Sequence, residues 1–168
     1  MDCITMGYKK IFDSHGNNRV ICLEEGDKGE FWIGTDSGLF IRREHENYLG
    51  EAFHDKGTPA SISADYITCM SKDKSGNMWI GTFYTGLNIW RNTADEMAVY
   101  FENPSKNSIK GKIVRSICSD NEDKIWFCTE DGWLNRLDAI NQTAKSFQIK
   151  EKLNMHYLVM DQDQMWIC

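Results

Sequence analysis

The stretch GNMWIGTFYTGLNIWR at residues 76–91 has two close copies elsewhere in the chain. They are GEFWIGTDSGLFIRR at residues 29–43 and DKIWFCTEDGWLNRL at residues 123–137, aligned with one single-residue adjustment in the turn. A step of 47 residues separates their tryptophans, Trp32, Trp79 and Trp126. The same step links apolar positions outside the stretch: Val20, Ile67 and Val114; Leu23, Met70 and Ile117; Phe53, Tyr100 and Phe147. The chain is therefore built from a 47-residue repeat.

Within each unit, short runs rich in Val, Ile, Trp, Phe and Tyr alternate with clusters of turn residues, a pattern typical of strands joined by hairpins. In the second unit we expect the strands near residues 66–71, 78–82, 86–91 and 98–102. No longer stretch has the apolar spacing of an amphipathic helix. Four antiparallel strands repeated every 40 to 50 residues, roughly, predict the blades of a β-propeller.

We therefore predict an all-β chain of about four propeller blades, forming one repeat array over residues 1–168. Complete blades are expected at residues 14–60, 61–107 and 108–154. Residues 1–13 have the pattern of the last strands of an upstream blade, and residues 155–168 that of the start of a further blade. The two end pieces could pair to close a four-bladed ring, or the chain could be a piece of a larger one.

The recurring tryptophans and small residues are interpreted as packing positions. Side chains alternate faces along a strand, so Trp79 and Gly81 share one face and Ile80 the other. Both faces are apolar, as in a blade held between two neighbours. The structural repeat positions are Trp32, Gly34, Trp79, Gly81, Trp126 and Trp166, with Cys128 in the place of the glycine in the third unit. A sugar-stacking role for the tryptophans is the alternative.

Composition excludes several classes of function. A formal net charge of −6 disfavours nucleic acid as a partner. The first residues show no secretory signal pattern, and no stretch is apolar enough for a membrane span. The six cysteines form no CxxC pair and the four histidines have no metal-ligand spacing, so we expect buried thiols, no cofactor and no metal.

The repeat resembles the two-component regulator propeller repeat. In the second unit the resemblance rests on Ile67, Met70, Asp73, Gly76, Met78, Trp79, Ile80, Gly81, Thr82, Gly86 and Leu87. The Ser-Ile pairs at residues 61–62 and 108–109 resemble the connector between blades in that family. The first unit departs from the pattern at Gly26, where Asp is expected, and the third departs at Asp123, Phe127 and Cys128.

This resemblance implies a sensor region of a hybrid two-component receptor of the Bacteroides type, in which many such repeats form an extracytoplasmic sensor that responds to glycans. It implies a non-catalytic ligand-sensing or interaction module, with an oligosaccharide or another receptor domain as partner. The expected location is periplasmic. Because the rings of the family are larger than four blades, the resemblance also favours a piece of a longer receptor.

Four residues at non-repeating aromatic or charged positions are candidates for a binding rim: Tyr84, Trp90, Trp133 and Arg136. Packing at blade edges is the alternative role for them. A propeller lyase or glycosidase is the alternative function, although the stretch from Ser71 to Trp79 that resembles an Asp-box is better interpreted as a hairpin turn. A protein-binding scaffold is the third possibility. We expect no catalytic residue in this chain.

Overall fold

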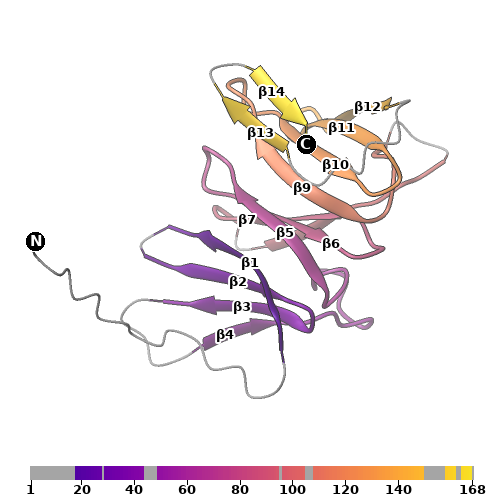
Figure 1. Ribbon diagram of the computed structural model, residues 1–168. Coiled ribbons are helices and arrows are strands. Elements are labelled where there is room, and N and C mark those ends of the chain that lie inside the picture. Colours follow the sequence, from indigo (N-terminus) through magenta and orange to yellow (C-terminus); the bar gives the residue numbers. More distant parts are fainter. Residues whose placement is uncertain are drawn as a thin grey trace, which may run out of the picture.

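A computed structural model describes residues 18–27, 29–43, 49–94, 96–104, 108–149, 158–161 and 164–167. Each of three successive segments folds into a four-stranded antiparallel meander whose strand order follows the chain (Figure 1). The expected all-β propeller blades are confirmed. The strands that we anticipated within residues 1–13 lie outside the described residues.

The three meanders are named blades I, II and III. Blade I contains β1 (Val20–Glu25), β2 (Phe31–Thr35), β3 (Gly38–Arg42) and β4 (Leu49–Ala52). Blade II contains β5 (Ile67–Lys72), β6 (Met78–Thr82), β7 (Leu87–Arg91) and β8 (Glu96–Tyr100). Blade III contains β9 (Val114–Ser119), β10 (Ile125–Thr129), β11 (Trp133–Asp138) and β12 (Thr143–Gln148). A two-stranded sheet of β13 (Leu158–Asp161) and β14 (Gln164–Ile167) follows.

The fourth strand of blade II begins two residues earlier than the sequence pattern predicts, at Glu96 rather than residue 98. The reason is its register with β7, because pairing starts with Arg91 opposite Glu96 directly after the turn. The guanidinium of Arg91 also lies 2.7 Å from the Glu96 carboxylate, which fixes the end of the hairpin. Polar residues therefore begin a strand that hydrophobic pattern alone places later.

The first strands of successive blades lie side by side, β1 against β5, β5 against β9 and β9 against β13 (Figure 1). One apolar cluster joins Trp32 and Leu39 of blade I to Ile67, Met70 and Ile80 of blade II. A second cluster repeats this arrangement one blade later, with Trp79 and Leu87 packed among Val114, Ile117 and Phe127. The face of each blade that carries the tryptophan therefore packs on the next blade, and Ile80 faces the preceding one.

Close packing between blades explains the small residues. A Cβ added to Gly81 would lie 2.6 Å from Cys69 Sγ and 2.9 Å from Val114 Cγ1, which leaves no room for a side chain. In blade III the two roles are exchanged. Cys128 occupies the glycine position, and its cross-strand neighbour is Ser116 in the place of Cys69. Each pair thus supplies one sulfur atom to the interior.

The hairpin between the first two strands of blade II is organised by Asp73. Its Oδ1 accepts hydrogen bonds from the backbone amides of Ser75 (3.0 Å) and Asn77 (2.9 Å). Its Oδ2 accepts one from the indole Nε1 of Trp79 at 2.8 Å. Asp120 binds the corresponding turn and Trp126 of blade III in the same way. The Asp-box-like pattern is therefore a structural turn that also holds the core tryptophan.

Candidate functional site

The loops between the strands gather at two ends of each blade. In a meander, the turn between the second and third strands lies at the same end as the connector to the next blade. In blades II and III this end carries the turn after β6, the turn after β10 and, of the connector between them, residues 101–104 and 108–113. The hairpin turns made by Asp73 and Asp120 lie at the opposite end. We call these the connector end and the hairpin end.

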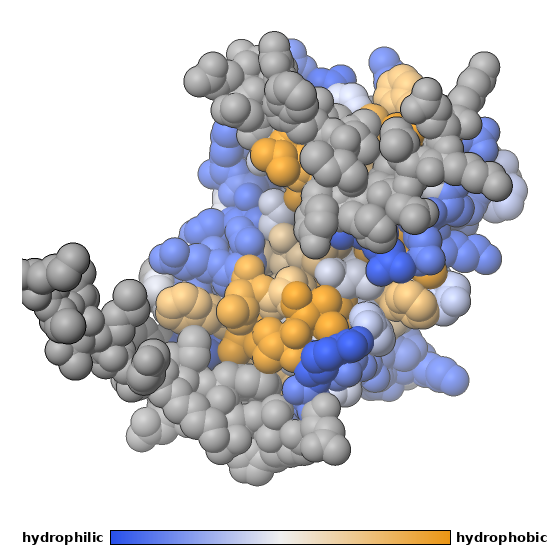
Figure 2. Space-filling view, in the orientation of Figure 1, coloured by the Kyte–Doolittle hydropathy of each residue, from blue (hydrophilic) through white to orange (hydrophobic). Residues whose placement is uncertain are grey.

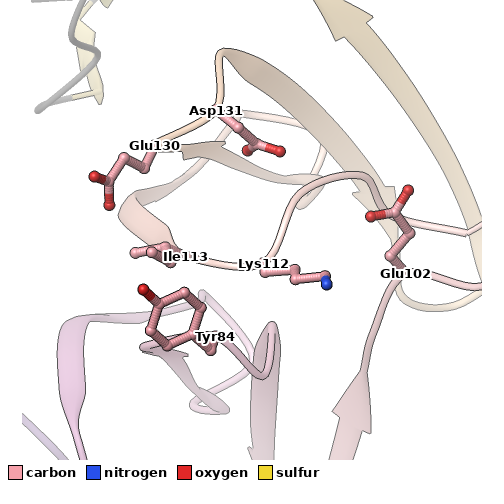
Figure 3. A pocket seen from close by; sticks show the side chains of 6 residues that line it. All are labelled: Tyr84, Glu102, Lys112, Ile113, Glu130 and Asp131. Atoms are coloured by element: carbon pink, nitrogen blue, oxygen red, sulfur yellow. The ribbon is translucent and has the colours of Figure 1, made fainter.

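A cavity of about 340 Å³ opens at the connector end between blades II and III (Figure 3). The residues that line it come from three loops: Tyr84, Glu102, Lys112, Ile113, Glu130 and Asp131. Its position follows from the repeat, because neighbouring blades bring their turns and their connector together at one edge. The volume lies near the lower end of the range for small-molecule pockets, about 300 to 1,000 Å³.

Tyr84 supplies an exposed aromatic ring at the mouth of this cavity. Its φ of 73° lies in the left-handed region, which is uncommon for an aromatic residue. The ring packs edge-on against Phe83, with centroids 4.3 Å apart, and Phe83 in turn lies 5.1 Å from Tyr66. A backbone conformation and a chain of aromatic contacts therefore hold the Tyr84 ring at the surface.

The acidic groups of the cavity are balanced by neighbouring bases. The Glu130 carboxylate lies 2.6 Å from the Arg115 guanidinium, and the Glu102 carboxylate lies 3.4 Å from the Lys110 ammonium. Asp131 Oδ1 accepts a hydrogen bond of 2.6 Å from the Thr129 hydroxyl. With Lys112 also on the wall, the cavity offers carboxylate acceptors and an ammonium donor without a strong net charge.

The structure places the four candidate rim residues apart. Tyr84 lines the cavity. Trp133 begins β11 directly after the turn that carries Glu130, and it is half-buried. Trp90 packs against Trp32, with ring centroids 5.9 Å apart and within the cluster between blades I and II. As ligand contacts, all four remain predictions.

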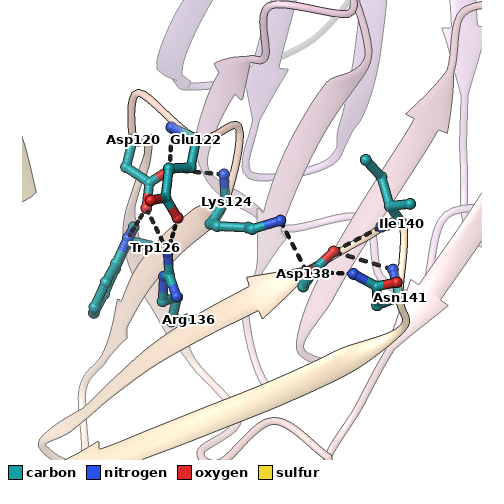
Figure 4. Close-up of polar contacts among 8 residues, drawn as sticks. All are labelled: Asp120, Glu122, Lys124, Trp126, Arg136, Asp138, Ile140 and Asn141. Carbon is teal, nitrogen blue, oxygen red and sulfur yellow. Dashed lines mark hydrogen bonds and ion pairs between the residues drawn. The ribbon is translucent and has the colours of Figure 1, made fainter.

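Arg136 lies at the hairpin end, beside the Asp120 turn of blade III (Figure 4). Its guanidinium is 2.9 Å from the Glu122 carboxylate, 3.4 Å from the Asp120 carboxylate and 5.5 Å from the Trp126 ring centroid. The geometry therefore joins Arg136 to the turn of its own blade. Four other side chains complete a smaller cavity of about 130 Å³ with it: Lys124, Asp138, Thr143 and Lys145.

Two of the polar groups that line this smaller cavity bind each other. Lys124 Nζ lies 2.8 Å from Asp138 Oδ2, which also accepts from the Asn141 amide at 2.8 Å. The hydrogen bond from Lys124, with those from Asn141, holds the pKa of Asp138 well below its usual range. These contacts support a structural role for the hairpin end.

Catalytic groups are not evident in the described part of the chain. Burial raises the pKa of the Cys22 thiol to about 12 and the pKa values of Cys118 and Cys128 to about 11, so these thiols stay protonated. Among the described residues no cluster of His, Cys, Asp and Glu could hold a metal ion. The same part of the chain contains no helix of the length and apolarity needed to cross a membrane.

The sequence did not single out five of the six residues of the larger cavity: Glu102, Lys112, Ile113, Glu130 and Asp131. All of them lie in or next to loops, where the repeat is weakest. The signal that could have found them is the combination of two loops 47 residues apart, at residues 83–86 and 130–133, with the connector between them. Only blade packing shows that these loops enclose a cavity.

A family model described as "two component regulator propeller" matches residues 14–37 and 61–84. A search of curated proteins finds no significant match. Among solved structures, the extracellular domain of a hybrid two component system of Bacteroides thetaiotaomicron, BT3049, has a TM-score of 0.77 at 19% identity over 90% of this chain and 22% of that one. This chain thus spans about a fifth of that domain.

Two further structures show the same fold. A catalytically inactive virginiamycin B lyase from Staphylococcus aureus has a TM-score of 0.69 at 11% identity over 92% of this chain and 50% of that one. The computationally designed Ika4 protein has a TM-score of 0.68 at 11% identity over 96% of this chain and 92% of that one. The three described blades and these shared folds show that the chain is a β-propeller array, in which residues 14–37 and 61–84 match the two-component regulator propeller repeat.

Proposed function

We propose that this chain is a non-catalytic, ligand-sensing part of an extracytoplasmic receptor propeller, and that it binds a neutral oligosaccharide at the connector-end cavity. One observation carries the proposal: an exposed aromatic ring, Tyr84, stands beside several carboxylates and an ammonium at one small opening. A sugar presents apolar C–H faces and hydroxyl groups. The ring can cover the first, and the charged groups can hydrogen-bond the second.

Charge balance favours a neutral glycan. Lys110, Arg115 and Lys112 offset the charges of Glu102, Glu130 and Asp131, so a uronic acid would gain no net attraction. The carboxylates would also repel it at close range. A volume of about 340 Å³ has room for one or two sugar units, with the rest of a chain extending into solvent.

The paired carboxylates also support a binding role rather than hydrolysis. A glycosidase needs one carboxylic acid and one free carboxylate on opposite sides of the scissile bond. Here the Glu130 carboxylate contacts the Arg115 guanidinium and the Glu102 carboxylate contacts the Lys110 ammonium, so both carboxylates are already engaged in ion pairs. The fold shared with a lyase carries no information about chemistry in this chain.

Calorimetric titration of the chain with neutral and uronic acid-containing oligosaccharides tests the proposal. Binding of a neutral member is expected, and Tyr84→Asn should weaken it by about tenfold, equivalent to the contribution of one aromatic contact. Asn is the suitable replacement because it tolerates the positive φ of this position.

The matched control is Ile140→Ala, which removes an exposed apolar side chain from the hairpin end. It should leave the affinity unchanged. Equal losses in the two variants, or no binding of any neutral glycan, would count against the cavity. Release of shorter or unsaturated sugars during the titration would instead establish the enzyme alternative.

A further inference from the structure

A cavity of about 260 Å³ opens between the outer strands of blades II and III, and we call it the outer pocket. Blade II contributes the end of β8 and the connector that follows it, and blade III contributes β11, β12 and the turn between them. Both facing sheets have all four strands. The pocket is distinct from the apolar surface over blade I in Figure 2, where Val20 and Leu23 are exposed.

The floor of the outer pocket is apolar and buried. Ile109, Leu137 and Ala144 line it, and none of these three is more than 3% exposed. The Tyr100 ring also lines the pocket, and so does Phe101, which is 60% exposed and therefore lies at the mouth. None of the described residues in the lining carries a charge. A charged ligand would therefore lose hydration here without gaining an ion pair.

Strand register gives the counterparts of two floor residues in the preceding interface. Leu137 stands opposite Ala144 on β11 and β12, as Trp90 stands opposite Met97 on β7 and β8. Trp90 and Met97 pack into the cluster between blades I and II, where the Trp90 ring lies 5.9 Å from that of Trp32. Blade III thus has two smaller side chains at the positions that blade II fills with an indole and a thioether.

A larger residue on blade II compensates for only part of this difference. By register, Tyr100 takes the place that Ala52 has in blade I. Its ring centroid lies 5.9 Å from that of Trp79, so Tyr100 covers this tryptophan in place of the missing indole. Leu137 and Ala144 nevertheless still line an open space. This interface therefore has room for an apolar group that the chain itself does not supply.

Hydrogen bonds within the connector hold one side of the mouth. The Ser108 hydroxyl accepts from the backbone amide of Asn103 at 2.8 Å and donates to the Asn103 carbonyl at 2.9 Å. From blade III, Gln142 lines the pocket with an exposed side chain that can donate or accept one hydrogen bond. The pocket is thus formed before a ligand enters, which lowers the entropic cost of binding.

We propose that the outer pocket binds a small neutral aromatic molecule of one or two rings. The preceding interface shows the size and apolarity of the group that fits, since an indole and a thioether fill the corresponding space there. A ring beside Tyr100 and Phe101 would gain aromatic contacts in addition to burial. A sugar is disfavoured, because its hydroxyls would find no partners on the apolar floor. This site does not depend on the glycan proposed for the connector-end cavity.

Ligand-observed nuclear magnetic resonance with indole, on the 168-residue chain, tests the site. Binding is expected with a Kd below about 1 mM. The charged indole-3-acetate should bind about tenfold more weakly, because the lining offers no cation. Ala144→Met introduces the side chain that blade II has at this position, and it should weaken indole binding by about tenfold because it fills the pocket.

Thr143→Met is the matched control, since it adds the same side chain at the neighbouring position of β12, outside the lining of the outer pocket. It should bind indole like the unmodified chain. Phe101→Ser removes the exposed ring at the mouth and should weaken binding by about fivefold, which provides a test if Ala144→Met does not fold.

Two results would overturn the proposal for this pocket: no binding of indole by the unmodified chain, or equal affinities of the unmodified chain and folded Ala144→Met. Tighter binding of N-acetyltryptophanamide than of indole would overturn the assignment to a free small molecule, because it would show that the pocket takes an aromatic side chain together with its peptide backbone.

Discussion

The first hairpins of blades I and II share one register but hold their tryptophans by different means. In blade II the indole of Trp79 donates to Asp73 at 2.8 Å. In blade I, Gly26 stands at the aspartate position, and a Cβ there would lie 2.6 Å from the Trp32 indole nitrogen. The Trp32 ring occupies the space that an aspartate side chain would fill. Its Nε1 donates a hydrogen bond to the Glu30 carboxylate, at 3.4 Å. The packing of the ring is common to both blades, whereas its polar partner is replaceable.

The third strands show a second difference between the same blades. Asn88 is fully buried in blade II and binds the connector, where its Oδ1 accepts from the Ser63 amide at 2.9 Å. Asn135 holds Lys110 in the same way in blade III. The residue at this register position in blade I is Phe40, which packs edge-on against Phe53. This site of the repeat therefore carries a hydrogen-bonding asparagine in blades II and III and a phenylalanine in blade I.

The largest effect that would sharpen this comparison is expected for Asn88→Ala. It leaves the Ser63 amide and the Ile80 carbonyl without their buried partner, which should lower the free energy of unfolding by about 3 kcal/mol. Urea denaturation followed by circular dichroism measures this loss. The matched change in blade I, Phe40→Leu, should cost about 1 kcal/mol because it removes only packing. Equal costs would show that the two attachments do not differ in kind.

A smaller effect is expected for Asp73→Ala, which removes hydrogen bonds to the turn amides and to Trp79. Because water can reach the turn, we expect a loss of about 2 kcal/mol in the same measurement. Gly26→Ala in blade I should also destabilise, by about 1 kcal/mol, since the new Cβ must displace the Trp32 ring. Ser75→Ala, at an exposed turn position, is the control. A neutral Gly26→Ala would refute the idea that the first hairpin is adapted to the missing aspartate.

The smallest effect concerns pH. Burial acts to raise the pKa of Asp120, but hydrogen bonds from the Trp126 indole and from the Lys124 and Glu122 amides outweigh it and lower the pKa. A pKa lower in the folded than in the unfolded state contributes stability above the unfolded value, near 4, and this contribution is lost as the pH falls through the folded value. The thermal midpoint of Asp120→Asn should therefore change less between pH 6 and pH 3, roughly, than that of the unmodified chain. Parallel curves for the two proteins would rule out this role for Asp120.

The repeat made the strands predictable, because a blade depends on short-range features: alternating apolar residues, turn residues and a fixed period. The hairpin strand Met78–Thr82 has the bounds expected from its pattern. The β8 strand does not, because its start depends on an ion pair and on the register with β7. Of the four candidate rim residues, Tyr84 lines the larger cavity, while Trp90 packs between blades. The sequence shows that a position is aromatic, but it does not show whether the neighbouring blade covers that side chain.

The sequence by itself determined the fold class and the 47-residue unit, and it predicted buried positions for Trp32 and Trp79, since each follows from periodicity along the chain. Only the tertiary structure showed which loops enclose a cavity. It also showed that the cysteine of each pair lies on the first strand in blade II, as Cys69 opposite Gly81, and on the second strand in blade III, as Cys128 opposite Ser116. The exposure of Leu23 and the burial of Met70 likewise came from the structure. These features depend on contacts between blades, where residues about 47 positions apart meet. The exposure of a side chain on a blade face depends on the neighbouring blade that packs against it. The residues adjacent to that side chain in the sequence do not determine this packing.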